Sequence, residues 1–214
     1  MVEHRQEFQR ELDDIEGKVI ELFAVVADDL PRATEALLTG NLETLRTLTE
    51  REQLVDALYP EIEGLVNREI ALQAPVASDL RFLLSVLRIV PELERSHDLV
   101  VDIAHRANHS LSGDLSPRSR GLVERMGQVV SDMWRTAVDS WYERDRTAAE
   151  GLQERDDELD DLHASLIGEL AAGQMAIPVT MEMTLVARSY ERLAAHAVNI
   201  ARRVIYLAGA QAPE

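Results

Sequence analysis

The sequence predicts an all-α protein built from two tandem three-helix bundles, with six long helices in total. The 214 residues include 46% hydrophobic but only 4% aromatic residues, with 10 Gly and 7 Pro, and this composition is typical of long helices. Apolar residues recur at helical spacing over long stretches of the chain. The second half repeats the pattern of the first, which indicates an internal duplication.

The first three helices are expected within residues 1–109, over the ranges 5–39, 42–72 and 76–108. Pro31 lies inside the first range, and because proline has no N–H to donate along the helix, we expect a kink or a break near Asp29. Gly40 and Asn41 are typical of the end of one helix and the start of an antiparallel one. These signals predict a three-helix bundle with short turns.

A polar segment at residues 110–117 is the predicted linker to a second bundle over residues 117–209. Beyond it the pattern starts again, and the first two helices of each half match without a gap. The matching polar positions are Glu52 with Asp156 and Asp56 with Asp160 at a shift of 104 residues, and Glu94 with Glu191 and Asp102 with Asn199 at a shift of 97. Polar positions that agree in register are harder to obtain by chance than apolar ones, which favours duplication.

An unusual group of acids lies in the third predicted helix. Glu94 points in nearly the same direction as Leu87 and Val90, which places a carboxylate in the middle of an apolar stripe. Asp98 and Asp102 follow at steps of four residues. Carboxylates on neighbouring turns repel one another unless a cation relieves them, and hard metal ions prefer clustered carboxylate oxygens. The group therefore predicts either a metal site or ion pairs within the protein.

At Glu94 and at Glu191, the alternative to a bound metal is an ion pair with an arginine. The arginines within reach are Arg81, Arg88 or Arg95 for Glu94, and Arg188 or Arg202 for Glu191. Ala195 stands where the repeat would place a partner for Asp98, and it has no oxygen ligand. The acids of the second half are therefore predicted to form the weaker site.

Three histidines follow an acid by three residues, as in the Glu-x-x-His motifs of di-iron helix bundles; they are His97, His105 and His163. A di-iron site needs two such motifs and two further Glu on four converging helices, which three-helix modules do not readily supply. We therefore predict these histidines to lie on helix surfaces or to support metal ligands. His196 is predicted to be a packing or interface residue.

Charge and composition argue against several function classes. The formal net charge of −17, from 22 basic and 39 acidic residues, disfavours nucleic acid and anionic lipid as partners. The absence of Cys excludes disulfides and thiolate metal sites. No signal peptide and no apolar run of about 18 residues is present, so we expect a cytoplasmic protein without membrane insertion. Without a phosphate-binding Gly-rich loop or a nucleophile elbow, no enzymatic activity is expected.

Short motifs recur in the third and sixth predicted helices. The first set is Ala-Pro-Val-Ala-Ser-Asp-Leu-Arg at 74–81, Leu-Glu-Arg at 93–95 with Asp98, and Asp-Ile-Ala at 102–104. The second set is Ala-Arg at 187–188, Tyr-Glu-Arg at 190–192 and His-Ala-Val-Asn-Ile-Ala at 196–201. Together they resemble the repeated signature of the PhoU family of phosphate-signalling proteins, and the likeness covers essentially the whole chain. Ser96 and His97 depart from the Ile-Gly usual in the first motif.

The resemblance implies a cytoplasmic, commonly homodimeric negative regulator of phosphate uptake and phosphate-starvation signal transduction. Such a protein is a non-catalytic adaptor between the phosphate ABC transporter ATPase subunit and a sensor histidine kinase. It also implies iron, zinc, manganese or magnesium ions at Glu/Asp-x-x-x-Asp motifs. The residues concerned are Glu52, Asp56, Glu94, Asp98, Asp102, Asp156, Asp160, Glu191 and Asn199. The alternative is a carboxylate-bridged, di-iron type bundle with a redox or storage role.

Overall fold

A computed structural model describes residues 2–109, 113–173 and 175–209, which form six α-helices and one short 3-10 helix, without any β-strand in these ranges. The elements are α1 (Val2–Thr39), α2 (Leu42–Gln73), α3 (Ala77–His105), η1 (Arg106–His109), α4 (Pro117–Glu143), α5 (Ala148–Ala171) and α6 (Ile177–Leu207). The predicted all-α class with two three-helix bundles is confirmed. Part of the predicted linker, residues 110–112, lies outside the described residues.

The turn between α1 and α2 forms as the sequence predicts. Gly40 has a φ of 74°, which Gly adopts without strain. Asn41 caps α2, because its side-chain oxygen accepts hydrogen bonds from the backbone N–H groups of Glu43 and Thr44. These local signals fix the reversal that makes α1 and α2 antiparallel neighbours.

The predicted alternative of a break near Asp29 is wrong, because α1 runs without interruption through Pro31. Leu30 and Ala33, on either side of the proline, are fully buried. Tertiary packing of both halves therefore outweighs the loss of one helical hydrogen bond at the proline.

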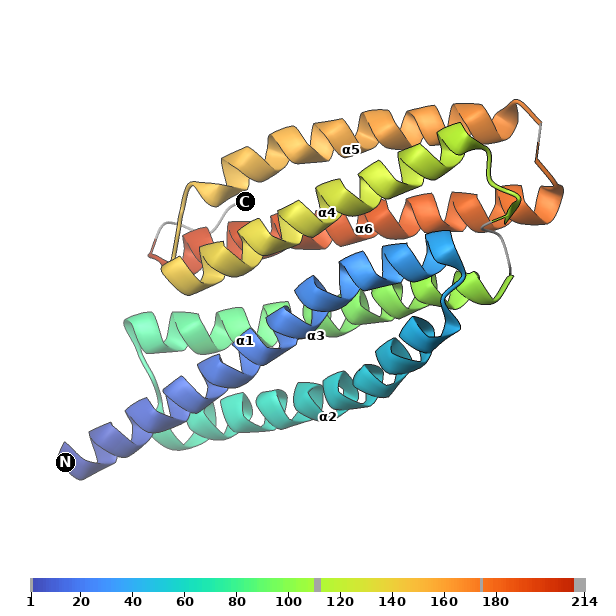
Figure 1. Ribbon diagram of the computed structural model, residues 1–214. Coiled ribbons are helices and arrows are strands. Elements are labelled where there is room, and N and C mark those ends of the chain that lie inside the picture. Colours follow the sequence, from blue (N-terminus) through green and yellow to red (C-terminus); the bar gives the residue numbers. More distant parts are fainter. Residues whose placement is uncertain (1, 110–112, 174, 210–214) are drawn as a thin grey trace.

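One hydrophobic core runs through both bundles. The contacts between them are made by α1 with α4 and by α3 with α6, whereas α2 and α5 lie on opposite outer sides (Figure 1). The Trp141 ring on α4 has its centroid 6.0 Å from that of Phe23 on α1 and 6.3 Å from that of Phe82 on α3. The two bundles are therefore packed through shared aromatic side chains.

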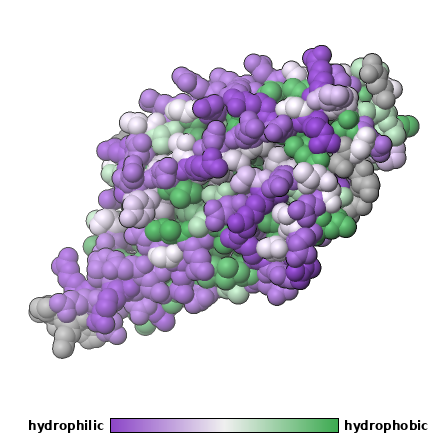
Figure 2. Space-filling model, viewed as in Figure 1, coloured by the Kyte–Doolittle hydropathy of each residue, from purple (hydrophilic) through white to green (hydrophobic). Residues whose placement is uncertain are grey.

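The face drawn in Figure 2 is mostly hydrophilic, with apolar side chains in small separate groups. Within the described ranges, no helix is both long and apolar enough to cross a bilayer.

Candidate functional site: two acidic clusters

The first acidic cluster consists of Asp56 on α2 with Glu94, Asp98 and Asp102 on α3. Glu94 is half-buried and the other three are exposed. The prediction that Glu94 lies in the middle of the buried stripe is therefore wrong. The buried face of α3 includes the fully buried Leu93, and Glu94 lies at its edge, beside α2.

The carboxylates of the first cluster destabilise one another's charge. The pKa of Glu94 is raised by burial and then by the charges of Asp98 and Asp56, while Arg95 opposes this rise. Burial likewise raises the pKa of Asp98, and Asp56 and Asp102 add to the rise. Each of these neighbours makes the ionised form less favourable, which is the effect that a bound cation reverses.

The predicted ion pair between Glu94 and an arginine does not form among the described residues. Arg95 lowers the pKa of Glu94 through its charge, yet no arginine nitrogen in these ranges lies within 4.0 Å of the Glu94 carboxylate. Glu52 lies one helical turn before Asp56 and is half-buried. It is not among the groups that shift the pKa of Glu94 or Asp98, so Asp56 is the α2 acid that the fold brings to the cluster.

The second acidic cluster consists of Asp156 and Asp160 on α5 with Glu191 on α6. Burial raises the pKa of Asp156, with Asp160 and Asp157 adding to the rise and Arg202 opposing it. Glu191, however, already has cationic or hydrogen-bonding partners. Its carboxylate lies 2.7 Å from Nδ1 of His163 and accepts a hydrogen bond of 3.1 Å from Arg188, so the predicted pairing with Arg188 is confirmed.

Asn199 is engaged elsewhere. Its side-chain amide donates a hydrogen bond of 3.3 Å to the carboxylate of Glu92 on α3, where the two bundles meet. In the described part of the chain, no three His, Asp or Glu side chains are placed so that they could hold a metal ion together. The carboxylate oxygens of the clusters are ligands that a hard cation prefers. To bind one together, their side chains must turn toward a common point.

A family comparison agrees with the geometry of the duplicated bundles. A model of the PhoU domain matches residues 19–107 and again residues 123–204. The chain belongs to the PhoU family. These two matches cover most of both bundles, including α3 and α6, which carry the signature motifs.

Individual PhoU relatives match over nearly their whole length. The phosphate-specific transport system accessory protein PhoU homolog of Zymomonas mobilis is 32% identical over 97% of this chain and 89% of its own. PhoU homolog 2 of Mycobacterium tuberculosis is 30% identical over 95% of this chain and 97% of its own. The crystal structure of PhoU from Pseudomonas aeruginosa superposes with a TM-score of 0.87 at 28% identity, covering 94% of this chain and 98% of that one.

The di-iron alternative finds no support in these comparisons. The structure also separates the acids, because the first cluster lies on α2 and α3 and the second on α5 and α6. A di-iron site requires ligands from four converging helices around one centre. The PhoU fold places each cluster beside its own pair of helices instead.

A buried polar node in the first PhoU repeat was not predicted. The carboxylate of Asp29 on α1 lies 2.6 Å from a guanidinium nitrogen of Arg51 on α2 and 3.1 Å from Nε2 of His97 on α3. Asp29 and His97 are fully buried, so the prediction that His97 lies on a helix surface is wrong, whereas a role in supporting metal ligands stays a prediction. The available signal was the helical spacing of Asp29 from Val26 and Ala33, which places it in the apolar stripe of α1.

His196 lies at the contact between α3 and α6, as predicted. Burial and then the charges of Arg95 and Arg192 lower its pKa to about 4, so the imidazole is neutral near pH 7. Its Nδ1 lies 2.7 Å from Oγ of Ser96, and that hydroxyl donates its only proton to the backbone carbonyl of Glu92. The neutral ring therefore carries its proton on Nδ1 and donates it to Ser96.

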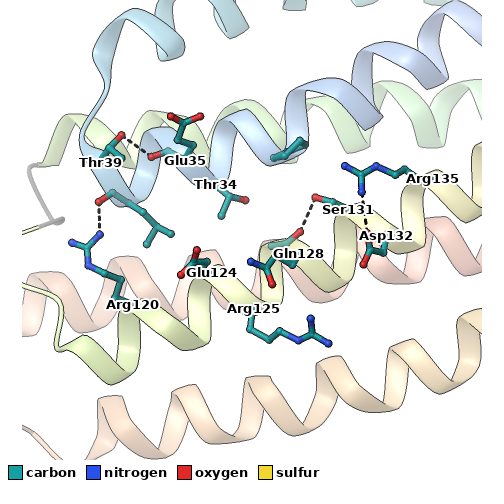
Figure 3. Close-up of a pocket in the computed structure, with 13 residues that line it drawn as sticks. Thr34, Glu35, Thr39, Arg120, Glu124, Arg125, Gln128, Ser131, Asp132 and Arg135 are labelled. Atoms are coloured by element: carbon teal, nitrogen blue, oxygen red, sulfur yellow. Dashed lines mark hydrogen bonds and ion pairs between the residues drawn. The ribbon is translucent and has the colours of Figure 1, made fainter.

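A groove of about 550 Å³ follows the contact between α1 and α4. Figure 3 shows acidic and basic side chains alternating along it, with Arg120 reaching the end of α1 and Asp132 paired with Arg135. Arg120 donates a hydrogen bond of 2.6 Å to the backbone carbonyl of Leu38. The polar groups of the groove thus join the two bundles and balance one another's charge. They do not converge on a single ligand position.

Proposed function

We propose that this protein is a cytoplasmic negative regulator of phosphate uptake and of phosphate-starvation signalling. In this role it is a non-catalytic adaptor between the ATPase subunit of the phosphate ABC transporter and a sensor histidine kinase. The observation that carries the proposal is the PhoU match over both repeats, together with relatives of 30% and 32% identity that are phosphate-specific transport accessory proteins. A helical adaptor regulates by presenting different surfaces to its partners in two states.

The adaptor role is tested by deleting the gene and by co-purifying the tagged protein. Loss of a negative regulator raises phosphate uptake and starvation-reporter expression when phosphate is plentiful, and restoring the gene reverses both. The tagged protein is expected to retain the transporter ATPase subunit or the kinase. The proposal fails if the deletion changes neither readout in phosphate-rich medium and neither partner is retained.

We also propose that the first acidic cluster binds a divalent or trivalent metal ion, with iron, manganese, magnesium or zinc as the candidates. Its support is the raised pKa of Glu94 and of Asp98, which a cation would reverse. The second cluster is the weaker site in this proposal, because Glu191 is engaged by His163 and Arg188.

Metal content after purification without chelator tests this assignment. The double substitution Asp56→Asn, Asp98→Asn is expected to remove most of the metal. The matched control is Glu43→Gln, Glu50→Gln, which also removes two charges from exposed acids but at a site where both already pair with Arg46. Equal metal in the two double variants would remove Asp56 and Asp98 from the ligand set.

A further inference from the structure

A pocket lined by arginines opens where α3 meets α6, in a protein whose formal net charge is −17. Its volume is about 410 Å³. The lining residues, called here the arginine pocket, are Arg88, Ile89, Glu92, Asn199, Arg202 and Arg203. Each helix supplies half of the lining, so the pocket joins the first repeat to the second.

The three guanidinium groups of the arginine pocket are available for a ligand. Among the described residues, none of them lies within 4.0 Å of a carboxylate oxygen. Elsewhere on the surface, arginines such as Arg46 and Arg125 do pair with glutamates. Arg203 is half-buried, and its guanidinium carbon lies 4.9 Å from the centre of the Tyr206 ring, which restricts how it can move.

Two of the arginines also repel each other. The pKa of Arg203 is lowered by burial and then by the positive charge of Arg88, and the opposing effects of Tyr206 and Glu92 do not compensate. An anion between Arg88 and Arg203 would remove this repulsion. It would also receive the charge-assisted hydrogen bonds for which the forked guanidinium is suited.

We propose that the arginine pocket binds inorganic phosphate. Arg88, Arg202 and Arg203 supply the positive charge and the N–H donors for a tetrahedral oxyanion. The carboxylate of Glu92 lies among them and can only accept hydrogen bonds while ionised. A ligand that carries both negative charge and a hydroxyl proton satisfies both conditions, and inorganic phosphate keeps at least one P–OH near pH 7.

Glu92 gives the pocket a means of selection between similar anions. Sulfate has no proton near neutral pH, and a phosphate monoester loses its second proton with a pKa of about 6. Either would place an acceptor against the Glu92 carboxylate. Simple carboxylates meet the same repulsion, so inorganic phosphate is the ligand that the whole lining fits.

A bound phosphate would link the two repeats through a ligand held by both α3 and α6. Arg202 also lowers the pKa of Asp156 in the second acidic cluster, so a ligand that draws Arg202 toward the pocket weakens its effect on that cluster. That phosphate binding here controls the adaptor rests on the proposed function. Binding itself is measured on the isolated protein, so binding and regulation can fail separately.

Calorimetric titration of the purified full chain with inorganic phosphate tests the site. Saturable binding is expected in the wild type, and the double variant Arg88→Gln, Arg203→Gln should bind roughly 100-fold more weakly because it loses charge-assisted hydrogen bonds. The control is Arg46→Gln, Arg135→Gln, which removes the same charge from exposed arginines outside the pocket. It should bind as the wild type does, and helical circular dichroism checks that all variants are folded.

Selectivity gives a second, independent readout. Sulfate and glycerol phosphate should each bind the wild type at least about tenfold more weakly than phosphate. In Glu92→Gln the affinities for these two anions should come closer to the affinity for phosphate, because the glutamine amide can donate to an acceptor oxygen. No saturable binding of phosphate by the wild type would overturn the proposal. Equal phosphate affinity of the Arg88→Gln, Arg203→Gln variant and the control would also overturn it. So would sulfate or glycerol phosphate binding to the wild type as tightly as phosphate or more tightly.

Discussion

At the scale of single residues, the same side-chain type has opposite effects in different places. The Asp29 carboxylate is fully buried but has Arg51 and His97 as partners from two other helices. Glu94 is half-buried and has acidic neighbours in Asp56 and Asp98. Removing a partner of a buried charge lowers the stability of the fold, because the remaining charge is left buried and unpaired. A carboxylate crowded by other carboxylates lowers the stability for as long as it is ionised.

Substitution of Asp29 should therefore be strongly destabilising. Asp29→Ala leaves His97 and Arg51 without the carboxylate between them, and we expect the free energy of unfolding to fall by about 3–5 kcal/mol. Chemical denaturation followed by circular dichroism measures it. Asp28→Ala, at the neighbouring exposed position, should change it by less than about 0.5 kcal/mol. Similar losses for both variants would show that the Asp29 contacts do not stabilise the bundle.

The pH dependence at Glu94 should have the opposite sign from that of a salt-bridged acid. Because its pKa is raised in the folded state, the folded protein binds the proton more tightly than the unfolded chain does. Stability contributed at this position therefore falls as pH rises from the unfolded pKa of about 4.3 through the higher folded value. Glu94→Gln removes this loss.

We expect Glu94→Gln to be more stable than the wild type at pH 7 by roughly 0.5 kcal/mol, the scale of interactions between surface charges. The difference should disappear below about pH 4, where Glu94 is protonated in both states. Thermal melts across this pH range, without added metal, measure it. Glu50→Gln is the control, because Glu50 pairs with Arg46 and should show no gain at pH 7.

The sequence predicts contacts between residues of one helix, but it does not predict contacts that depend on how two helices pack. The neighbourhood of Glu94 with Asp98 follows from helical spacing alone, whereas that of Glu94 with Asp56 depends on how α2 packs against α3. The engagement of Asn199 with Glu92 depends on how α6 packs against α3. Spacing along one helix carries no information about such a contact between the two bundles.

At the scale of helices, the crossing of α1 and α4 depends on a residue without a side chain. A Cβ at Gly127 on α4 would lie 2.6 Å from both Cγ2 and Oγ1 of Thr34 on α1. Thr34 cannot rotate away freely, because its hydroxyl contacts the Leu30 carbonyl at 3.1 Å and the Tyr190 hydroxyl at 2.8 Å. The two helices approach this closely only because position 127 is Gly.

Gly127→Ala should therefore push α1 and α4 apart. We expect a loss of about 1–3 kcal/mol in the free energy of unfolding, as for other overpacked interiors. Gly121→Ala on the same helix meets nothing within 4 Å and should instead stabilise by about 0.5–1 kcal/mol through helix propensity. Adding Thr34→Ala to Gly127→Ala should recover part of the loss. Stabilisation by Gly127→Ala alone would contradict the close approach.

Helix boundaries could be predicted where local chemistry decides them and not where packing does. The Gly40-Asn41 turn lies as predicted, because the cap is made by adjacent residues. Pro31 is a strong local break signal, and burial of its neighbours overrides it. Gly127 carries no sign in the sequence that α1 crosses there, because that requires knowing which helix faces α4.

At the scale of the whole molecule, the two PhoU repeats should not behave as independent domains. One core runs through both, and Trp141 of the second repeat packs against Phe23 and Phe82 of the first. The hydroxyls of Thr34 and Tyr190 join them again, and both are buried. Separating the repeats would expose these groups to water, so opening one repeat removes contacts that stabilise the other.

This coupling predicts a single unfolding transition, and the distribution of tryptophans allows a direct test. Both tryptophans lie on α4, but only Trp134, whose indole N–H donates to the Leu193 carbonyl of α6, reports the second repeat by itself, because Trp141 also contacts Phe23 and Phe82 of the first. Fluorescence is therefore followed in a Trp141→Phe background, whereas far-ultraviolet circular dichroism reports all six helices. The two probes should give the same denaturation midpoint. Asp29→Ala, whose lost contacts lie wholly in the first repeat, should shift both midpoints equally. If the tryptophan midpoint stays unchanged while the dichroism curve splits into two steps, the repeats unfold separately and the shared core does not couple them.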